Sequence, residues 1–578
     1  MKSSLRLTLF CLEGILLFAA PLYGASDRRD LFDRSESRSM VITRDGIVAT
    51  SQTLASQAGA QILAQGGSAV DAAIAANAVL GIVEPMNGGI GGDLFAAYWD
   101  AKTGKISGLN SSGWAPEKLT VQFLKQKGYT QMPTSGIYTV TIPGCVEGWA
   151  KLHERYGRLP WKELFKPAIY YAEQGFPVTE WVHNYWVAEK DKLAADQNAR
   201  SIYLTDGKPP EVGEMFHNPE YGHALELIAD QGETAFYRGL IAKSILETSA
   251  RLGGTITAGD LSEFQAQWVT PISTTYRGWT VYELPSNAQG MATLEMLNIM
   301  EKFPLPNWGV MNADAFHVEL EAQKLAYSDL RRYNADPKFV EVPTGGIISK
   351  KYAAFRAQAI DMKHAHCDVK FGKLDLVGNE TVYLSVVDKN GNIVSLIQSI
   401  SDSFGSGIVV DHFGFHLQDR GAMFLLDPGH PDVLAPRKRP FHTIIPAFME
   451  KGDVHIGFGI MGGLNQPQAQ AQFVSDIVDD GMNIQSALEK PRFTKLGFSG
   501  CDFKIEDRVP EAIRKELSGR GHELDVRGNY SFWMGGGQAV MHNSATGVNY
   551  GASDPRKDGA AVPQPDPYFV RASGKVKK

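Results

Sequence analysis

The chain is best understood from sixteen residues, Gly378-Asn-Glu-Thr-Val-Tyr-Leu-Ser-Val-Val-Asp-Lys-Asn-Gly-Asn-Ile393. The side chains from Thr381 onward alternate between two sets, which predicts a strand over residues 381–388. Asn and Gly tolerate positive φ, so residues 388–392 predict a hairpin turn, and residues 393–400 predict its second strand. A Thr at the first position of a core strand contributes little to packing. It suits a nucleophile that becomes an N-terminus when the chain is cut before it.

This hairpin resembles the start of the small subunit in the γ-glutamyltranspeptidase family, whose motif is Thr-x-x-x-Ser-Val-Val-x-x-x-Gly. Further stretches are similar to the family's other motifs and follow in the same order: Gly66-Gly-Ser-Ala-Val-Asp-Ala-Ala73, Val83-Glu-Pro-Met-Asn-Gly-Gly-Ile-Gly-Gly-Asp93, Pro143-Gly-Cys-Val-Glu-Gly-Trp149, Pro285-Ser-Asn-Ala-Gln-Gly290, Gly462-Gly463 and Tyr550-Gly-Ala-Ser-Asp-Pro-Arg556. Six ordered motifs are far more specific than one short pattern. The sequence is therefore identified as a member of this family from about residue 40 onward.

Composition sets the broad class of the protein. The chain has 578 residues, of which 43% are hydrophobic and 21% charged, as in ordinary globular proteins. The net charge of −7 argues against a nucleic-acid partner or an acidic membrane surface. Residues 1–25 carry Lys2 and Arg6 before an apolar run, which predicts a secretory signal peptide and a secreted or periplasmic protein. Beyond them, no apolar run reaches about 20 residues, so we expect no membrane insertion.

Three cysteines remain after residue 25: Cys145, Cys367 and Cys501. An odd count gives no disulfide framework, so each is predicted to be a small packing residue. Asp361, His364, His366, Cys367 and Asp368 have the side chains of a metal cluster, but no second ligand group accompanies them. The glycines of residues 88–92 lack a phosphate-loop pattern. We therefore expect neither a metal nor a cofactor.

The distribution of patterns predicts an α+β protein. Strands are expected at 381–388, 393–400, 453–459 and 537–542, residues 145–330 are expected to be mostly helical, and 362–380 are expected to form an exposed linker. Apolar spacing predicts helices at 53–65, 70–83, 161–174, 223–231, 240–252, 313–327, 466–480, 483–490 and 509–519. The resemblance implies more: a four-layer αββα N-terminal-nucleophile hydrolase sandwich. It also implies a large subunit (26–380) and a small subunit (381–578) that remain associated as a heterodimer, with further oligomerisation left open.

The resemblance places the chemistry at the start of the small subunit. Cutting the Glu380–Thr381 bond would supply a hydroxyl nucleophile and an α-amino base on one residue, because an α-amino group titrates at about 8. Ser399 matches the hydroxyl that the family places beside the nucleophile, usually a Thr. Backbone N–H groups at Gly462-Gly463 would stabilise the oxyanion.

The residues that bind the substrate depart from the family pattern. Ser112 stands where transpeptidases for glutathione carry an Arg for the α-carboxylate. Ser401, Arg420 and Met423 stand where they carry an Asn, a Gln or Glu, and an Asp for the α-amino group. Met423 removes a counter-charge, and Arg420 would repel a substrate ammonium. Losing both ionic clamps argues for another substrate.

Two further positions support this interpretation. The family's Ser-Ser pair reads His442-Thr443 here, and these residues and Arg420 make the region more similar to the amidohydrolase and acylase branch. Arg420 is suited to binding a carboxylate, so we expect an acidic acyl group without an α-amine on a small-molecule amide or peptide.

Three hypotheses follow from the sequence. The first is an autoprocessed threonine amide hydrolase that acts through an acyl-enzyme on a substrate other than ordinary γ-glutamyl compounds. The second is a glutathione hydrolase or γ-glutamyltransferase with an atypical clamp. The third is an inactive binding scaffold, which the intact Thr381, Ser399 and Gly462-Gly463 disfavour.

Overall fold

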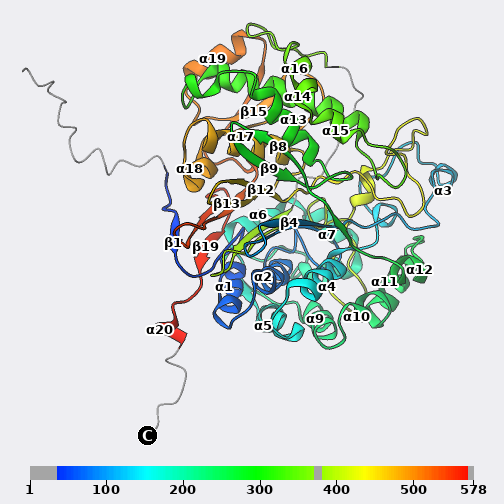
Figure 1. Ribbon diagram of the computed structural model, residues 1–578. Coiled ribbons are helices and arrows are strands. Elements are labelled where there is room, and N and C mark those ends of the chain that lie inside the picture. Colours follow the sequence, from blue (N-terminus) through cyan, green and yellow to red (C-terminus); the bar gives the residue numbers. More distant parts are fainter. Residues whose placement is uncertain (1–35, 370–380, 571–578) are drawn as a thin grey trace, which may run out of the picture.

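The computed structural model describes residues 36–369 and 381–570 (Figure 1). The predicted signal peptide and Glu380 lie outside these residues. Among the described residues, no helix combines the length and apolarity needed to cross a bilayer.

Two seven-stranded sheets, here named sheet A and sheet B, form the centre of the molecule, and all pairings within them are antiparallel. The order in sheet A is β1 (Val41–Thr43), β18 (Val548–Ser553), β17 (Gly537–Asn543), β13 (Val454–Ile460), β12 (Ala447–Lys451), β9 (Trp279–Glu283) and β8 (Ile272–Tyr276). The order in sheet B is β19 (Ala560–Pro563), β2 (Ile47–Thr50), β10 (Val382–Val387), β11 (Ile393–Ser399), β3 (Asp93–Asp100), β4 (Lys105–Ser111) and β7 (Gln267–Val269).

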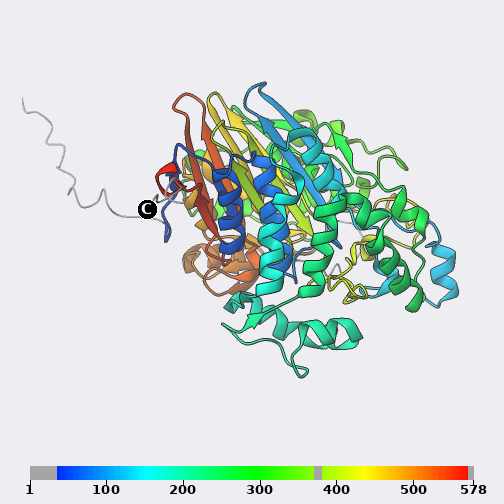
Figure 2. The same ribbon diagram turned by 90° about the horizontal axis from the view of Figure 1, so that it is seen from below.

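Helices cover the outer faces of both sheets, so the molecule has four layers (Figures 1 and 2). The sheet B side carries α1 (Thr53–Ala64), α2 (Ala69–Val83), α4 (Cys145–Tyr156), α5 (Lys166–Gln174), α6 (Glu180–Ala188), α7 (Lys190–Ala195), α8 (Gln197–Tyr203), α9 (Pro219–Gln231), α10 (Glu233–Tyr237), α11 (Leu240–Arg251) and α12 (Ala258–Ser262). The sheet A side carries α13 (Gly290–Met300), α14 (Ala313–Tyr333), α15 (Thr344–Ile347), α16 (Lys350–Ala357), α17 (Asn465–Val478) and α18 (Ile484–Glu489).

Smaller elements complete the fold. They are α3 (Val121–Gln126), α19 (Glu511–Gly519), α20 (Pro567–Val570), the pair β5 (Phe176–Pro177) and β6 (Met215–Phe216), and a third sheet of β14 (Phe493–Thr494), β15 (Asp502–Glu506) and β16 (Glu523–Arg527). The third sheet and α19 pack on α14 through a cluster that includes Phe316, Leu320 and Ile505.

Strand β10 is buried on both faces because it lies between a helical layer and the other sheet. Val382, Leu384 and Val386 belong to the core shared with α2, whereas Tyr383 points into the core between the sheets. A Cβ atom on Gly459 of β13 would overlap the Tyr383 ring. Glycine at this position therefore allows the two sheets to approach closely.

Both sheets mix strands from before residue 369 and after residue 381. In sheet B, β10 pairs on one side with β2 and on the other with β11, and β11 pairs with β3. The segments 36–369 and 381–570 are thus two parts of one folded unit, not two separate domains.

The predicted α+β class is confirmed, and all four predicted strands and the main predicted helices are present. The prediction that residues 145–330 are mostly helical is wrong at 267–283, which form β7, β8 and β9. Arg277 and Gly278 have φ of 46° and 86° and join Tyr276 to Trp279, which is a two-residue hairpin turn.

The prediction that the cysteines form no disulfide is also wrong. Cys367 and Cys501 are bonded across 134 residues of sequence, with Cα atoms 4.9 Å apart, and Cys145 is a buried free thiol. Three cysteines can form one disulfide and leave one free thiol. The fold brings the partners together, so spacing alone gave no sign of the pair.

Candidate active site

Thr381 and Ser399 lie at the ends of neighbouring strands. Val382 pairs with Gln398 and Tyr383 with Ile397, so one further step in this register sets Thr381 opposite Ser399. Both residues are fully buried. The Ser399 hydroxyl accepts hydrogen bonds from Ser401 N at 2.8 Å and from Arg420 Nη2 at 3.1 Å. The hairpin therefore places a second, firmly held hydroxyl at the level of the predicted nucleophile.

The Gly462-Gly463 turn lies at the same level on the facing sheet. Ser385 of β10 contacts Gly457 of β13, and Tyr383 packs over Gly459, so the next step along both strands relates Thr381 to Met461. The two glycines follow directly, with φ of 123° and 58°. In the described chain, neither of their N–H groups donates to another protein group.

Hydrogen bonds to its two carbonyl groups hold the Gly462-Gly463 turn in place. Gln289 donates from Nε2 to the Gly463 carbonyl at 2.9 Å and also to the Thr443 carbonyl. Asn465 N and Gln466 N donate to the carbonyls of Gly462 and Gly463. With both carbonyls held, the N–H groups of the turn are oriented donors.

Arg420 lies in the short 3₁₀ helix η5 (Arg420–Met423) and is only 1% exposed. It donates to Thr443 Oγ1 at 2.8 Å and to Ser399 Oγ at 3.1 Å. Burial lowers the pKa of its guanidinium to about 10, while the carboxylates of Asp93 and Asp419 act in the opposite sense. Arg420 is therefore a buried cation at neutral pH, in direct contact with the serine beside Thr381.

Asp93 organises the other side of the site. It pairs with Ser399 across β3 and β11. Its Oδ2 atom is 3.0 Å from His442 Nε2, and its Oδ1 atom accepts from Gly113 N at 2.9 Å and from Gln418 Nε2 at 2.8 Å. Asp93 was not among the predicted site residues, although it ends the glycine-rich motif at 83–93.

His442 has a neutral imidazole ring, and both of its ring nitrogens have hydrogen-bond partners. Burial and the neighbouring Arg420 lower its pKa to about 4. Ile444 N donates to Nδ1 at 3.4 Å, so the proton sits on Nε2 and is donated to Asp93. The ring thus orients Asp93, and of the predicted pair it is Thr443 whose hydroxyl meets Arg420.

Ser112 lies in a network of amide side chains. Asn287 Nδ2 donates to Ser112 Oγ at 3.1 Å, and Arg439 Nε donates to the Ser112 carbonyl at 2.7 Å. Asn287 and Arg439 also line a cavity of about 150 Å³. The position that carries the family's carboxylate clamp is therefore neutral here.

The two remaining positions also offer no counter-charge for an ammonium group. Ser401 is buried, with φ of 84°, and its N–H is bonded to Ser399. Met423 is buried in an apolar cluster with Phe441 and Leu330.

A cluster with metal-ligand chemistry lies outside this site. The ligand atoms of His317, Glu321 and His522 lie within 4.8 Å of one another. Lys324 Nζ is 2.5 Å from Glu321, so an ammonium group already neutralises this carboxylate. Cys367, the cysteine of the cluster at residues 361–368, is bonded to Cys501 and is not a thiolate ligand.

Two seven-stranded antiparallel sheets between helical layers, with a buried Thr at the start of a central strand, define an N-terminal-nucleophile hydrolase fold. A family model described as gamma-glutamyltranspeptidase matches residues 55–564. The chain belongs to the γ-glutamyltranspeptidase family, and the predicted membership and fold are confirmed.

Related proteins cover nearly the whole chain. The glutathione hydrolase-like YwrD proenzyme of Bacillus subtilis is 35% identical over 90% of this chain and 99% of its own length. The oxamate amidohydrolase proenzyme of Klebsiella pneumoniae is 32% identical over 90% and 99%. The crystal structure of cephalosporin acylase from Bacillus halodurans superimposes with a TM-score of 0.86 at 39% identity, covering 92% of this chain and 97% of that one. These relationships indicate an amidohydrolase or acylase of this family. Its members are processed into two subunits that stay together, and they act on small molecules.

Proposed function

We propose that this protein is an autoprocessed amide hydrolase whose nucleophile is Thr381 and whose substrate carries an acidic acyl group. The observation that carries the proposal is Arg420. This guanidinium is buried beside Ser399, and within the described ranges both of its hydrogen-bond partners are neutral hydroxyl groups, while its Nε has none. A buried cation of this kind is best satisfied by a carboxylate.

Processing creates the nucleophile and its base. The Thr381 hydroxyl attacks the preceding carbonyl, and water releases Glu380 as a carboxylate and Thr381 as a free α-amine. The amine, which titrates near 8, then accepts the hydroxyl proton when Thr381 attacks a substrate amide. Ser399 orients the attacking oxygen from the neighbouring strand.

The facing turn stabilises the charge that develops. The N–H groups of Gly462 and Gly463 would donate to the oxyanion, and each such donor contributes about 3 kcal/mol to the transition state. The protonated α-amine of Thr381 passes its proton to the nitrogen of the substrate amide, and the C–N bond breaks. The acyl group then remains on Thr381 as an ester. Water, activated by the same amine, hydrolyses this acyl-enzyme.

The residues around the acyl group favour an anion over an α-amino acid. Neutral Ser112, Ser401 and Met423 offer no ion pair to a zwitterion. Arg420 attracts a carboxylate and repels an ammonium group. The name of one relative, oxamate amidohydrolase, describes an anionic amide as that protein's substrate. A glutathione hydrolase with an atypical clamp is the alternative that the test below distinguishes.

The first test is the intact mass of wild type and Thr381→Ala, followed by turnover on the same samples. We expect two wild-type fragments that meet between Glu380 and Thr381, a single mutant chain, and hydrolysis of amides with acidic acyl groups. Turnover of γ-glutamyl-p-nitroanilide at a similar rate would favour the glutathione hydrolase. An uncut wild-type chain would favour an inactive scaffold and contradict the proposal.

Export is part of the same proposal. It rests on the character of residues 1–25 and on the Cys367–Cys501 bond, because disulfides persist mainly in oxidising compartments. The mature chain is then a large subunit ending at Glu380 and a small subunit beginning at Thr381.

A further inference from the structure

The disulfide and the proposed cleavage point have a specific relationship in sequence. Cys367 precedes Thr381 and Cys501 follows it, so the bond spans the Glu380–Thr381 peptide. We propose that the Cys367–Cys501 disulfide joins the large and small subunits covalently after processing. This inference rests on the proposed cleavage before Thr381, and it adds a cross-link that the shared sheets do not require.

The chemistry balances in two independent steps. Hydrolysis of the peptide bond consumes one water and leaves the Glu380 carboxylate and the Thr381 amine. Bond formation removes one proton and one electron from each of two thiols. The two electrons pass to a small-molecule or protein disulfide of the exporting compartment, which is reduced to two thiols.

The chain before Cys367 is held against the small subunit by its backbone. Ala365 N donates to the Arg520 carbonyl at 2.7 Å, and Gly500 N donates to the Cys367 carbonyl at 3.2 Å. Both contacts join the end of the described large-subunit segment to the loops around β15 and β16. Two backbone hydrogen bonds therefore hold the chain around Cys367 against the chain around Cys501, in addition to the disulfide.

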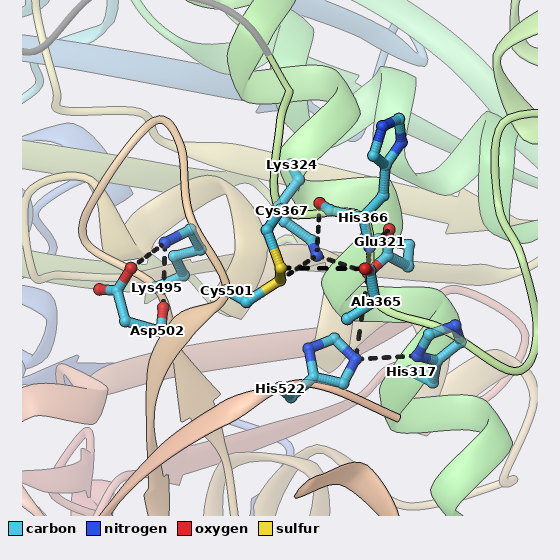
Figure 3. The surroundings of a disulfide bond; sticks show 10 residues. All are labelled: His317, Glu321, Lys324, Ala365, His366, Cys367, Lys495, Cys501, Asp502 and His522. Carbon is cyan, nitrogen blue, oxygen red and sulfur yellow. Dashed lines mark hydrogen bonds and ion pairs between the residues drawn. A yellow bond between two sulfur atoms is a disulfide. The ribbon is translucent and has the colours of Figure 1, made fainter. Parts of the chain in front are cut away.

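The side chains around the sulfur atoms favour formation of the bond (Figure 3). Lys324, on α14, directs its Nζ atom to Cys501 Sγ at 3.7 Å and to the His366 carbonyl at 3.0 Å. A neighbouring ammonium group stabilises a thiolate, which is the form that attacks a disulfide. Cys367 is exposed whereas Cys501 is 4% exposed, so an external disulfide reaches Cys367 first and Cys501 then resolves it.

The cross-link has a consequence for the cleaved protein. Without it, each unfolding event would release two chains, whose reassembly depends on their concentration. With it, reassembly is intramolecular and independent of dilution. The bond therefore keeps the two chains of an exported enzyme together when they would otherwise diffuse apart.

The test uses purified full-length protein alkylated with N-ethylmaleimide before denaturation. Without reductant, we expect one species with the summed mass of both fragments; with reductant, we expect the two fragments. Cys367→Ser should show two fragments under both conditions, and Cys145→Ser, which removes the buried free thiol, should match wild type. Two wild-type fragments without reductant would overturn the inference.

The outcomes separate this inference from the proposed function. A wild-type chain that stays whole after reduction defeats the processing step, and the inter-subunit link with it. Non-reducing peptide mapping of Thr381→Ala then reports the Cys367–Cys501 pairing alone. As a second readout, tenfold dilution during refolding from urea should slow Cys367→Ser about tenfold and leave wild type unchanged. Equal slowing of both proteins would contradict the cross-link.

Discussion

Replacing Arg420 by Gln, which keeps a polar side chain but removes the positive charge, tests the acidic-acyl proposal. Arg420 is 1% exposed, so solvent screens its charge little. Its pKa of about 10 keeps it protonated at pH 7.5. A buried ion pair that loses one partner costs about 2 to 5 kcal/mol, which corresponds to roughly 30- to 4,000-fold in kcat/KM. Arg420→Gln should lose this factor only for substrates that carry the carboxylate.

The assay compares two p-nitroanilides of equal chain length, glutaryl and pentanoyl, on the same enzyme sample. The ratio of their kcat/KM values cancels any difference in the processed fraction, because both substrates see the same active molecules. Wild type should prefer the glutaryl compound by at least about 30-fold, and Arg420→Gln should bring the ratio near one. Arg437→Gln provides the matched control, since Arg437 is partly exposed and pairs with Glu117, Glu263 and Asp260 outside the site. A ratio that stays within about threefold of wild type in Arg420→Gln would refute the reasoning.

Three further substitutions test the structure around the site. Gly459→Ala forces a Cβ atom into the Tyr383 ring and should destabilise the fold by about 1 to 3 kcal/mol; an unchanged calorimetric midpoint would argue against close sheet packing. Asp93→Asn replaces an acceptor of four hydrogen bonds and turns a donor toward His442 or toward the backbone, so urea unfolding should show a loss of about 1 to 3 kcal/mol, and wild-type stability would contradict this role. Burial, with a smaller contribution from nearby charge, lowers the pKa of His416 to about 3, so the unfolded chain binds its proton first and stability is lost as pH falls from 6.5 toward 3. His416→Phe should therefore lose about 2 kcal/mol less than wild type between pH 6.5 and 5, and equal losses in urea titrations would exclude the effect.

Local patterns were sufficient for the central hairpin. The loop from Asp388 to Asn392 folds as expected, because Asp388 Oδ1 accepts from Asn390 N and Asn392 N and Gly391 takes φ of 84°. The β8–β9 hairpin carried an equally clear signal, a β-rich alternation interrupted by Arg277-Gly278. The sequence does not predict this hairpin, because the helical stretches on both sides of it indicate a helical region as a whole.

The parts of the site that sequence could not supply are set by pairings across the fold. Asp93 and His442 are 349 residues apart and meet only because the chain before β12 of sheet A packs on the start of β3 in sheet B. The disulfide depends in the same way on the packing of the third sheet against α14. A charged residue at the first position of the buried strand β3 is the one local sign in the sequence that Asp93 has a role beyond the turn.

The arrangement of the sheets explains why cleavage would leave an intact site. The proposed small subunit supplies Thr381, Ser399 and Arg420, and the large subunit supplies Asp93 and Ser112. Strand β10 keeps β2 as a neighbour on one edge, and β11 keeps β3, so separating the subunits would expose the edges of buried strands and leave their backbone groups unpaired. That cost holds the native heterodimer together without a covalent bond. The disulfide therefore acts mainly in states where these strands have already separated, which is why concentration-dependent refolding, rather than native activity, is the property expected to respond to its loss.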